Sequence, residues 1–221
     1  MSLQETITEI INDIKRLSNG ELVRFLGQSN ILYSIAYGVT IPELRKIAKP
    51  HYGNHQLALE LYEQDIRECK IIASMIDDPA LVTGEQIDTW AQNFTNHEIV
   101  EQVCSNLFWK SEYALSRSIE WCLSGDELLQ KAGFIIAAKA ASITEINDVV
   151  FEPYIEIIEN LDDLLISQNK TTVDFALRQI ALRCDFLSQK VIDVARQMSE
   201  SDNEHRAWIG NQLLFELEEG Q

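Results

Sequence analysis

Two side chains on one predicted helix, His97 and Glu101, are placed to take part in chemistry. They are four residues apart, a spacing that puts two side chains on the same face of an α-helix. Glu101 could supply carboxylate chemistry beside the imidazole, or the pair could be an exposed ion pair or hydrogen bond without a catalytic role. No other potential ligand has a compelling spacing from His97, so we expect no metal and no cofactor.

Several basic residues belong to a pattern of small and apolar residues that returns along the chain. Lys70 and Lys131 lead the first two copies and predict a basic row facing phosphate groups; the alternative is that each lysine extends from a buried helix to solvent. Arg178 follows an apolar run, which favours a functional or structural charge network. The four copies cover residues 68–76, 130–138, 172–180 and 205–214, and Arg206 stands at the start of the last.

The repeated pattern also predicts the architecture. Each copy has the apolar spacing of a helix and follows another amphipathic helix, and the copies recur after intervals of about 61, 40 and 35 residues. Such intervals are typical of helix pairs in HEAT-type arrays, with two pairs in the first interval. We therefore predict an all-α superhelix of HEAT- or armadillo-like repeats, curved with a concave face, that fills residues 1–221 as one domain.

Capping residues mark several helix starts. Thr40 and Pro42 predict a start, Thr83 and Gln86 have capping-box spacing, and Asn96 is the predicted N-cap of the helix that carries His97 and Glu101. Helices are further predicted over residues 3–17, 21–27, 42–49, 55–63, 65–76, 111–122, 126–141, 144–165, 171–184, 188–198 and 203–217.

The composition is that of an ordinary soluble protein, with 46% apolar and 24% charged residues. The chain has no membrane-length apolar run and no signal-like N-terminus, so we expect a cytoplasmic protein. Residues 1–3 could be an expression scar and receive no functional weight. The cysteines at 69, 104, 122 and 184 form no close pairs and are predicted to be reduced core residues.

The net charge of −17 argues against an extensive interface with nucleic acid, because phosphate neutralisation needs a basic face. Whole-chain charge does not describe one face, however, and the charge is unevenly distributed. Residues 143–168 contain no Lys or Arg, and a new helix is expected to begin near Pro153. The acidic side chains there follow helical steps, which favours a solvated outer face; they are Glu145, Asp148, Glu152, Glu156, Glu159 and Asp163.

Several motifs, taken in order, resemble the AlkD-like DNA alkylation-repair family. They are YGVTIPELR at 37–45, QVCSNLF at 102–108, KAGF at 131–134 and FALRQI at 175–180. The resemblance extends over roughly residues 22–217. It implies a curved stack of HEAT-like repeats whose active members are DNA glycosylases that release cationic N3- and N7-alkylated purines. In that chemistry a carboxylate stabilises the cationic sugar and orients water, while aromatic faces hold the sugar.

The resemblance also assigns roles, with substitutions at each principal position. The family's aromatic residue and catalytic aspartate fall on His97 and Glu101, its arginine on Lys131, and a second aromatic wall on Phe175. Glutamate reaches about one carbon further than aspartate, and lysine cannot clamp a phosphate in bidentate fashion. The implied DNA-binding residues are Lys70, Lys131, Phe175, Arg178 and Arg206.

Two functions follow from these substitutions, and action on another nucleic acid or on a nucleoside is a third, weaker alternative. One is a DNA glycosylase whose activity is weak or lost. The other is a non-catalytic scaffold that binds DNA structures or another protein. We expect DNA to be a weakly bound partner in either case.

Overall fold

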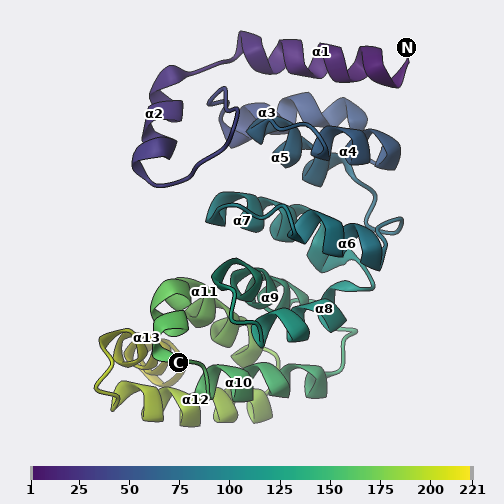
Figure 1. Cartoon of the computed structure of the whole chain (residues 1–221). Coiled ribbons are helices and arrows are strands. Elements are labelled where there is room, and N and C mark those ends of the chain that lie inside the picture. Colours follow the sequence, from purple (N-terminus) through teal and green to yellow (C-terminus); the bar gives the residue numbers. More distant parts are fainter. Residues whose placement is uncertain (1, 220–221) are drawn as a thin grey trace. The chain divides into compact units, whose positions relative to one another are not determined.

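The computed structural model describes residues 2–219, and every named element in that range is helical (Figure 1). One isolated β-bridge joins Ile35 to Ile66. The chain divides into two compact units: unit 1 ends at Glu112 and unit 2 begins at Tyr113. The fold class is therefore the predicted all-α class. The prediction of one domain over residues 1–221 stays a prediction, because most tertiary contacts lie within one unit or the other.

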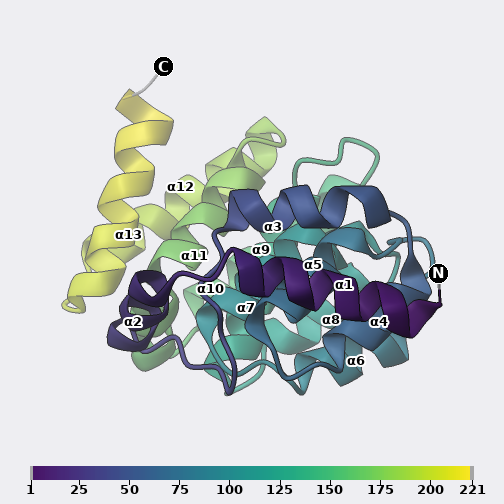
Figure 2. The same ribbon diagram turned by 90° about the horizontal axis from the view of Figure 1, so that it is seen from above.

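Unit 1 stacks helices in sequence order. Helix α5 packs against α3, α4 and α7, and α1 packs against α3 and α4 (Figures 1 and 2). Successive helices α3, α5 and α7 thus form one layer of the unit. The elements are α1 (Leu3–Arg16), α2 (Gly20–Gln28), α3 (Ile41–Ala48), η1 (Lys49–His51), α4 (His55–Tyr62), α5 (Arg67–Ile76), α6 (Gly84–Ala91), α7 (His97–Asn106) and η2 (Phe108–Lys110).

Unit 2 consists of three helix pairs in two layers. Helix α11 packs against α9 and α13 in one layer, and α10 packs against α8 and α12 in the other (Figure 1). The elements are α8 (Ala114–Cys122), α9 (Glu127–Ala140), η3 (Asp148–Phe151), α10 (Glu152–Glu159), α11 (Asp163–Ala181), α12 (Asp185–Ser199), α13 (Glu204–Leu214) and η4 (Phe215–Glu219).

The repeat prediction is confirmed by the positions of these helices. The four copies of the pattern fall on α5, α9, α11 and α13, each of which packs against the helix that precedes it in its pair. Helix α7 lies in the long first interval, as the prediction of two pairs there requires.

Most predicted caps are also confirmed. Thr40 and Glu43 form a reciprocal capping box at α3, and the side chain of Asn96 accepts a hydrogen bond from the N–H of Ile99 at α7. At α6 the side chain of Thr83 accepts from the N–H of Gln86, but the Gln86 amide donates to Asp77, 2.6 Å away. The predicted capping box at Thr83 is therefore only half formed, because the Gln86 side chain binds the buried Asp77 carboxylate and not the backbone at Thr83.

The predicted break between residues 165 and 171 is wrong. Helix α11 continues from Asp163 to Ala181, and the break lies at residues 160–162, where the Asp162 carboxylate caps Leu164 at 2.8 Å. Asn169, inside the predicted break, is buried on α11, and its amide nitrogen donates to the carbonyl of Glu127 on α9.

Glycine permits close backbone approach in both units. Gly38 has a φ of 74°, and a Cβ at this position would lie 2.2 Å from the carbonyl oxygen of Asn19. A Cβ at Gly210 on α13 would lie 2.4 Å from the carbonyl oxygen of Ala195 on α12. The first glycine lets the chain that leads into α3 pass close to the start of α2, and the second lets two helices pack at short distance.

The cysteine prediction is confirmed for three positions. Cys69, Cys104 and Cys122 are buried and unbridged, while Cys184 is only half-buried. Burial raises the pKa of the Cys69 thiol to about 12 and keeps it protonated at neutral pH. Across residues 2–219, no helix has the length and apolar character needed to cross a membrane.

Candidate nucleic-acid interface

Helix α7 carries both residues of the predicted catalytic pair. His97 is its first residue and is half-buried, whereas Glu101, one turn later, is exposed. The opposite side of α7 is buried through Ile99, Val100 and Val103. The fold therefore leaves the carboxylate of Glu101 accessible to a ligand. Its catalytic role, and that of His97, stay predictions.

A buried ion network fixes the first turn of α7. The Arg67 guanidinium binds Glu98 through two hydrogen bonds of 2.8 and 2.6 Å and binds Glu68 at 3.0 Å. Tyr33 donates to the same Glu98 carboxylate at 2.9 Å. Burial would lower the pKa of Arg67, but the hydrogen bond and charge of Glu98 outweigh it and raise that pKa. Burial, reinforced by Glu98, raises the pKa of Tyr33.

The second carboxylate of this network holds the chain before α3. Glu68 is fully buried, and its oxygens accept the N–H groups of Tyr37, Gly38 and Val39 at distances of 2.9–3.2 Å. Three N–H donors together with Arg67 satisfy a charge that would otherwise be costly to bury. The motif at 37–45 is thus explained structurally: a carboxylate holds its first residues and a capping box starts its helix.

Lys70 rests on an aromatic stack in unit 1. Its ammonium lies 5.5 Å from the ring centroid of Tyr62, which in turn stacks on Trp90 at 3.8 Å. A half-buried lysine over a π-face can still meet a phosphate at its outer side. Its DNA-binding role remains a prediction.

In unit 2, Lys131 and Phe175 differ in accessibility. Lys131 on α9 is 9% exposed and has an interaction with the protein, whereas Phe175 on α11 is 39% exposed. Of the two, Phe175 is the better placed to contact a ligand. Another aromatic ring in the same layer is partly exposed: Trp208 on α13, with the Lys170 ammonium 4.4 Å from its centroid.

The two predicted arginines of unit 2 bind the protein itself. Arg178 forms an ion pair with Asp174 at 2.9 Å and another with Glu216. Arg206 binds Asp163 at 2.5 Å and donates to the carbonyls of Glu159 and Leu161, which end α10 and precede α11. Both would have to leave these partners to bind phosphate. Their DNA-binding role remains a prediction, and the observed contacts are structural.

The acidic stripe is only partly the solvated face that the sequence suggested. Three of its carboxylates, including Asp163, bind basic residues from later parts of the chain, which sequence spacing could not reveal. The other two pairs are Asp148 with Arg183 at 2.7 Å and Glu152 with Lys190 at 2.5 Å. The remaining acids, Glu145, Glu156 and Glu159, are exposed.

The cations of unit 1 that sequence reasoning passed over lie between α1 and η1. Five of them are exposed and, within the described residues, form no ion pair; they are Lys15, Arg24, Arg45, Lys46 and Lys49. We call them the unit 1 cations. Between residues 15 and 51 the chain has six Lys and Arg residues and only two acids, Glu21 and Glu43. This local excess of positive charge is present in the sequence, but the net charge of −17 for the whole chain does not reveal it.

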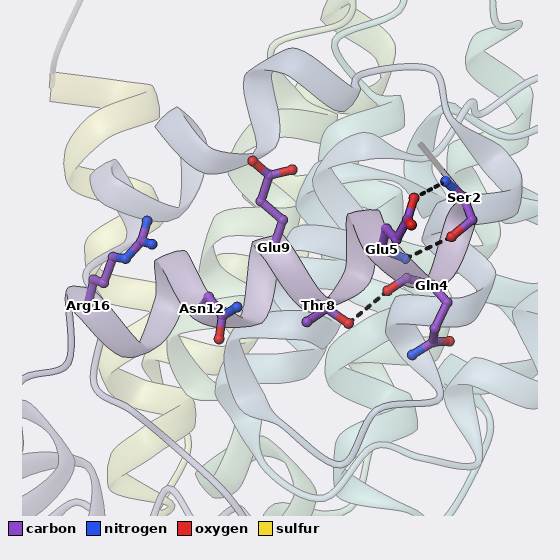
Figure 3. Close-up of a pocket in the computed structure, with 7 residues that line it drawn as sticks. All are labelled: Ser2, Gln4, Glu5, Thr8, Glu9, Asn12 and Arg16. Carbon is purple, nitrogen blue, oxygen red and sulfur yellow. Dashed lines mark hydrogen bonds between the residues drawn. The ribbon is translucent and has the colours of Figure 1, made fainter.

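Two hollows on unit 1 border this region. A groove of about 530 Å³ between α1 and α3 is lined by Arg16, Lys46 and His51, with Glu9 and Asp13 on its α1 side. The outer face of α1 forms a second, shallow hollow of about 630 Å³ (Figure 3). Ser2 and Glu5 form a capping box there, so Ser2 has a structural role. This second face carries Glu5 and Glu9 against Arg16 and is therefore ill suited to a polyanion.

The helical pairs define a HEAT-like repeat protein, and the comparisons with known proteins agree. The family model described as DNA alkylation repair enzyme matches residues 34–163, more than half of the chain. The chain therefore belongs to the DNA alkylation repair enzyme family. Curated proteins give no sequence match.

A solved structure shares the fold. It is described as a new family of proteins related to the HEAT-like repeat DNA glycosylases with affinity for branched DNA structures. The TM-score is 0.77 and the sequence identity 19%, over 97% of this chain and 94% of that one. At that identity the likeness establishes the fold alone.

Proposed function

We propose that this protein binds DNA through unit 1, prefers branched DNA to linear duplex and has little or no glycosylase activity. The observation that carries the proposal is the set of unit 1 cations, exposed and without ion pairs in a chain of net charge −17. Release of counterions from DNA phosphates is the main source of non-specific affinity, and it requires cations that are free to meet phosphate. The branched-DNA affinity described for the protein of similar fold supports the choice of ligand.

The geometry of α7 supports the loss of glycosylase activity. Glu101 stands where the family's aspartate is expected, and its carboxylate lies about one carbon further from the backbone. Helix α7 has little freedom to retreat and compensate, because Glu98 is held by Arg67 and Asn96 is bound to the carbonyl of Leu32. A displacement of about 1 Å can reduce a rate about 100-fold.

Binding is tested by fluorescence anisotropy with a four-way junction and a linear duplex of the same arm sequence, across a salt series. We expect linear duplex to bind with a Kd of about 10⁻⁴ to 10⁻⁶ M and to weaken steeply as salt rises, and the junction to bind more tightly. No DNA binding at low salt would refute the proposal. Tight binding that is insensitive to salt would refute its electrostatic basis.

Catalysis is tested by single-turnover excision from an oligonucleotide that contains N7-methylguanine. We expect release no faster than spontaneous depurination, from the wild-type protein and from Glu101→Gln alike. The double variant His97→Trp/Glu101→Asp restores the family's pair, and recovered activity would mean that only this pair had been lost.

The second candidate function is a glycosylase that uses Glu101. It is favoured by one observation, the exposure of that carboxylate on α7. Wild-type excision well above the spontaneous rate, abolished by Glu101→Gln, would establish this function and overturn the proposed loss of activity.

A further inference from the structure

The segment between α2 and α3, residues 29–40, exposes large apolar side chains on a backbone that is firmly bound. Leu32 is 62% exposed and Ile35 is 44% exposed. Tyr33, between them, is directed inward and donates to Glu98. We call this segment the α2–α3 loop. Single exposed apolar residues are common on protein surfaces, whereas several close together mark an interaction site.

This loop is fixed on both sides of its exposed residues. The carbonyl of Leu32 accepts from the Asn96 amide at 2.9 Å, and the carbonyl of Ile35 accepts from the N–H of Arg67 at 2.9 Å. Further along, Glu68 binds the N–H groups of residues 37–39. The anchors come from the N-terminal ends of α5 and α7. Because the backbone is held before any ligand arrives, little ordering entropy remains to be lost on binding.

The charge around the loop suits a polyanion. Residues 22–42 contain Arg24 and no Asp or Glu, and Arg45, Lys46 and Lys49 follow on α3. The anchoring end of α7 is also the end that carries His97, where active family members have an aromatic residue. The carboxylates of Glu68 and Glu98 contact the loop, and both are paired with Arg67. An apolar loop with adjacent cations and no acid of its own is a combination that proteins use to insert side chains between DNA bases.

We infer that Leu32 and Ile35 form a wedge that enters the branch point of a DNA junction, while the unit 1 cations hold the flanking phosphates. The inference rests on the proposed function. Insertion into continuous duplex costs a few kcal/mol per step because stacked bases must separate. At a branch point the stack is already interrupted, so the same wedge buries apolar side chains against exposed base-pair faces at lower cost. The wedge thereby favours branched over linear DNA.

The test compares the wild-type chain with the double variant Leu32→Ser/Ile35→Ser and the control Leu81→Ser. Leu81 is 52% exposed in unit 1, in the loop between α5 and α6, and follows Asp77 and Asp78. Junction and duplex affinities are measured at one salt concentration, and 2-aminopurine placed at the branch point reports unstacking. Chemical denaturation checks that all three proteins have the same stability.

We expect the double variant to lose about tenfold in junction affinity and to give no 2-aminopurine response, with duplex affinity unchanged. Leu81→Ser should behave as wild type, and Leu32→Phe should keep the junction preference. If the double variant retains both the junction preference and the 2-aminopurine signal, the wedge is wrong and DNA binding stands. If the wild-type chain binds neither DNA, the proposed function fails and the wedge with it.

Discussion

The two units contain equal numbers of basic residues, nine each, but use them differently. In unit 2 six of the nine bind carboxylates; they are Arg117, Arg178, Arg183, Lys190, Arg196 and Arg206. In unit 1 the five unit 1 cations have no such partner among the described residues. The difference teaches that the number of cations in a sequence does not measure the number available to a ligand.

Unit 1 also buries the charge network of Arg67, Glu68 and Glu98, and breaking that network should have the largest effect. Glu68→Ala would leave three N–H groups and part of the Arg67 guanidinium without their acceptor. We expect a loss of about 3–5 kcal/mol in the free energy of unfolding, measured by urea denaturation. Glu101→Gln is the matched control, because that exposed side chain should change stability by less than about 0.5 kcal/mol. Equal effects would contradict the network's structural role.

A packing change in unit 2 should separate stability from DNA binding. Gly210→Ala places a methyl group 2.4 Å from the carbonyl oxygen of Ala195, and we expect a loss of about 1–3 kcal/mol. Because unit 1 carries the proposed interface, junction affinity at a temperature where the variant is folded should match wild type. A parallel fall in affinity would show that unit 2 contributes to binding.

Removing cations should distinguish the units directly. Arg45→Gln/Lys49→Gln should reduce duplex affinity about tenfold and reduce the slope of log affinity against log salt by about two. Lys190→Gln/Arg196→Gln in unit 2 removes the same charge from residues already paired with Glu152 and Asp193, so both quantities should stay near wild type. Fluorescence anisotropy across a salt series measures both. An equal loss of duplex affinity in the two double variants would show that paired and unpaired cations contribute alike to DNA binding.

The smallest effect is expected at Asp148 in unit 2, a partly exposed carboxylate paired with the buried side chain of Arg183. The hydrogen bond from Arg183 holds the pKa of Asp148 below its ordinary value. A carboxyl whose folded-state pKa is depressed stabilises the protein above its unfolded pKa of about 3.9, and this contribution is lost as the pH falls through the folded value. Asp148→Asn should therefore lower stability slightly at pH 7 and not at pH 2.5. Thermal unfolding at the two pH values would check this; a difference that persists at pH 2.5 would point to packing instead.

Local signals were sufficient for most of the fold. Thr40 with Glu43, and Asn96 before Ile99, specify helix starts through hydrogen bonds within three residues, so the sequence alone locates them. The break before α11 was misplaced, and Asn169 lies inside the predicted gap. Its amide binds the carbonyl of Glu127, 42 residues away, and no local pattern contains that contact.

The candidate site was less predictable, because its contacts also join residues that are far apart in the sequence. The sequence by itself determined the repeating helices, the family resemblance, and the change to His97 and Glu101 at the family's principal positions. Only the tertiary structure decided which charges remain available. It paired Arg178 and Arg206 with acids in unit 2, buried Arg67 between Glu68 and Glu98, and left the cations of α2 and α3 exposed. Helix periodicity depends on neighbours three or four residues away, whereas the partner of a charge depends on helices that the fold brings together from distant parts of the chain.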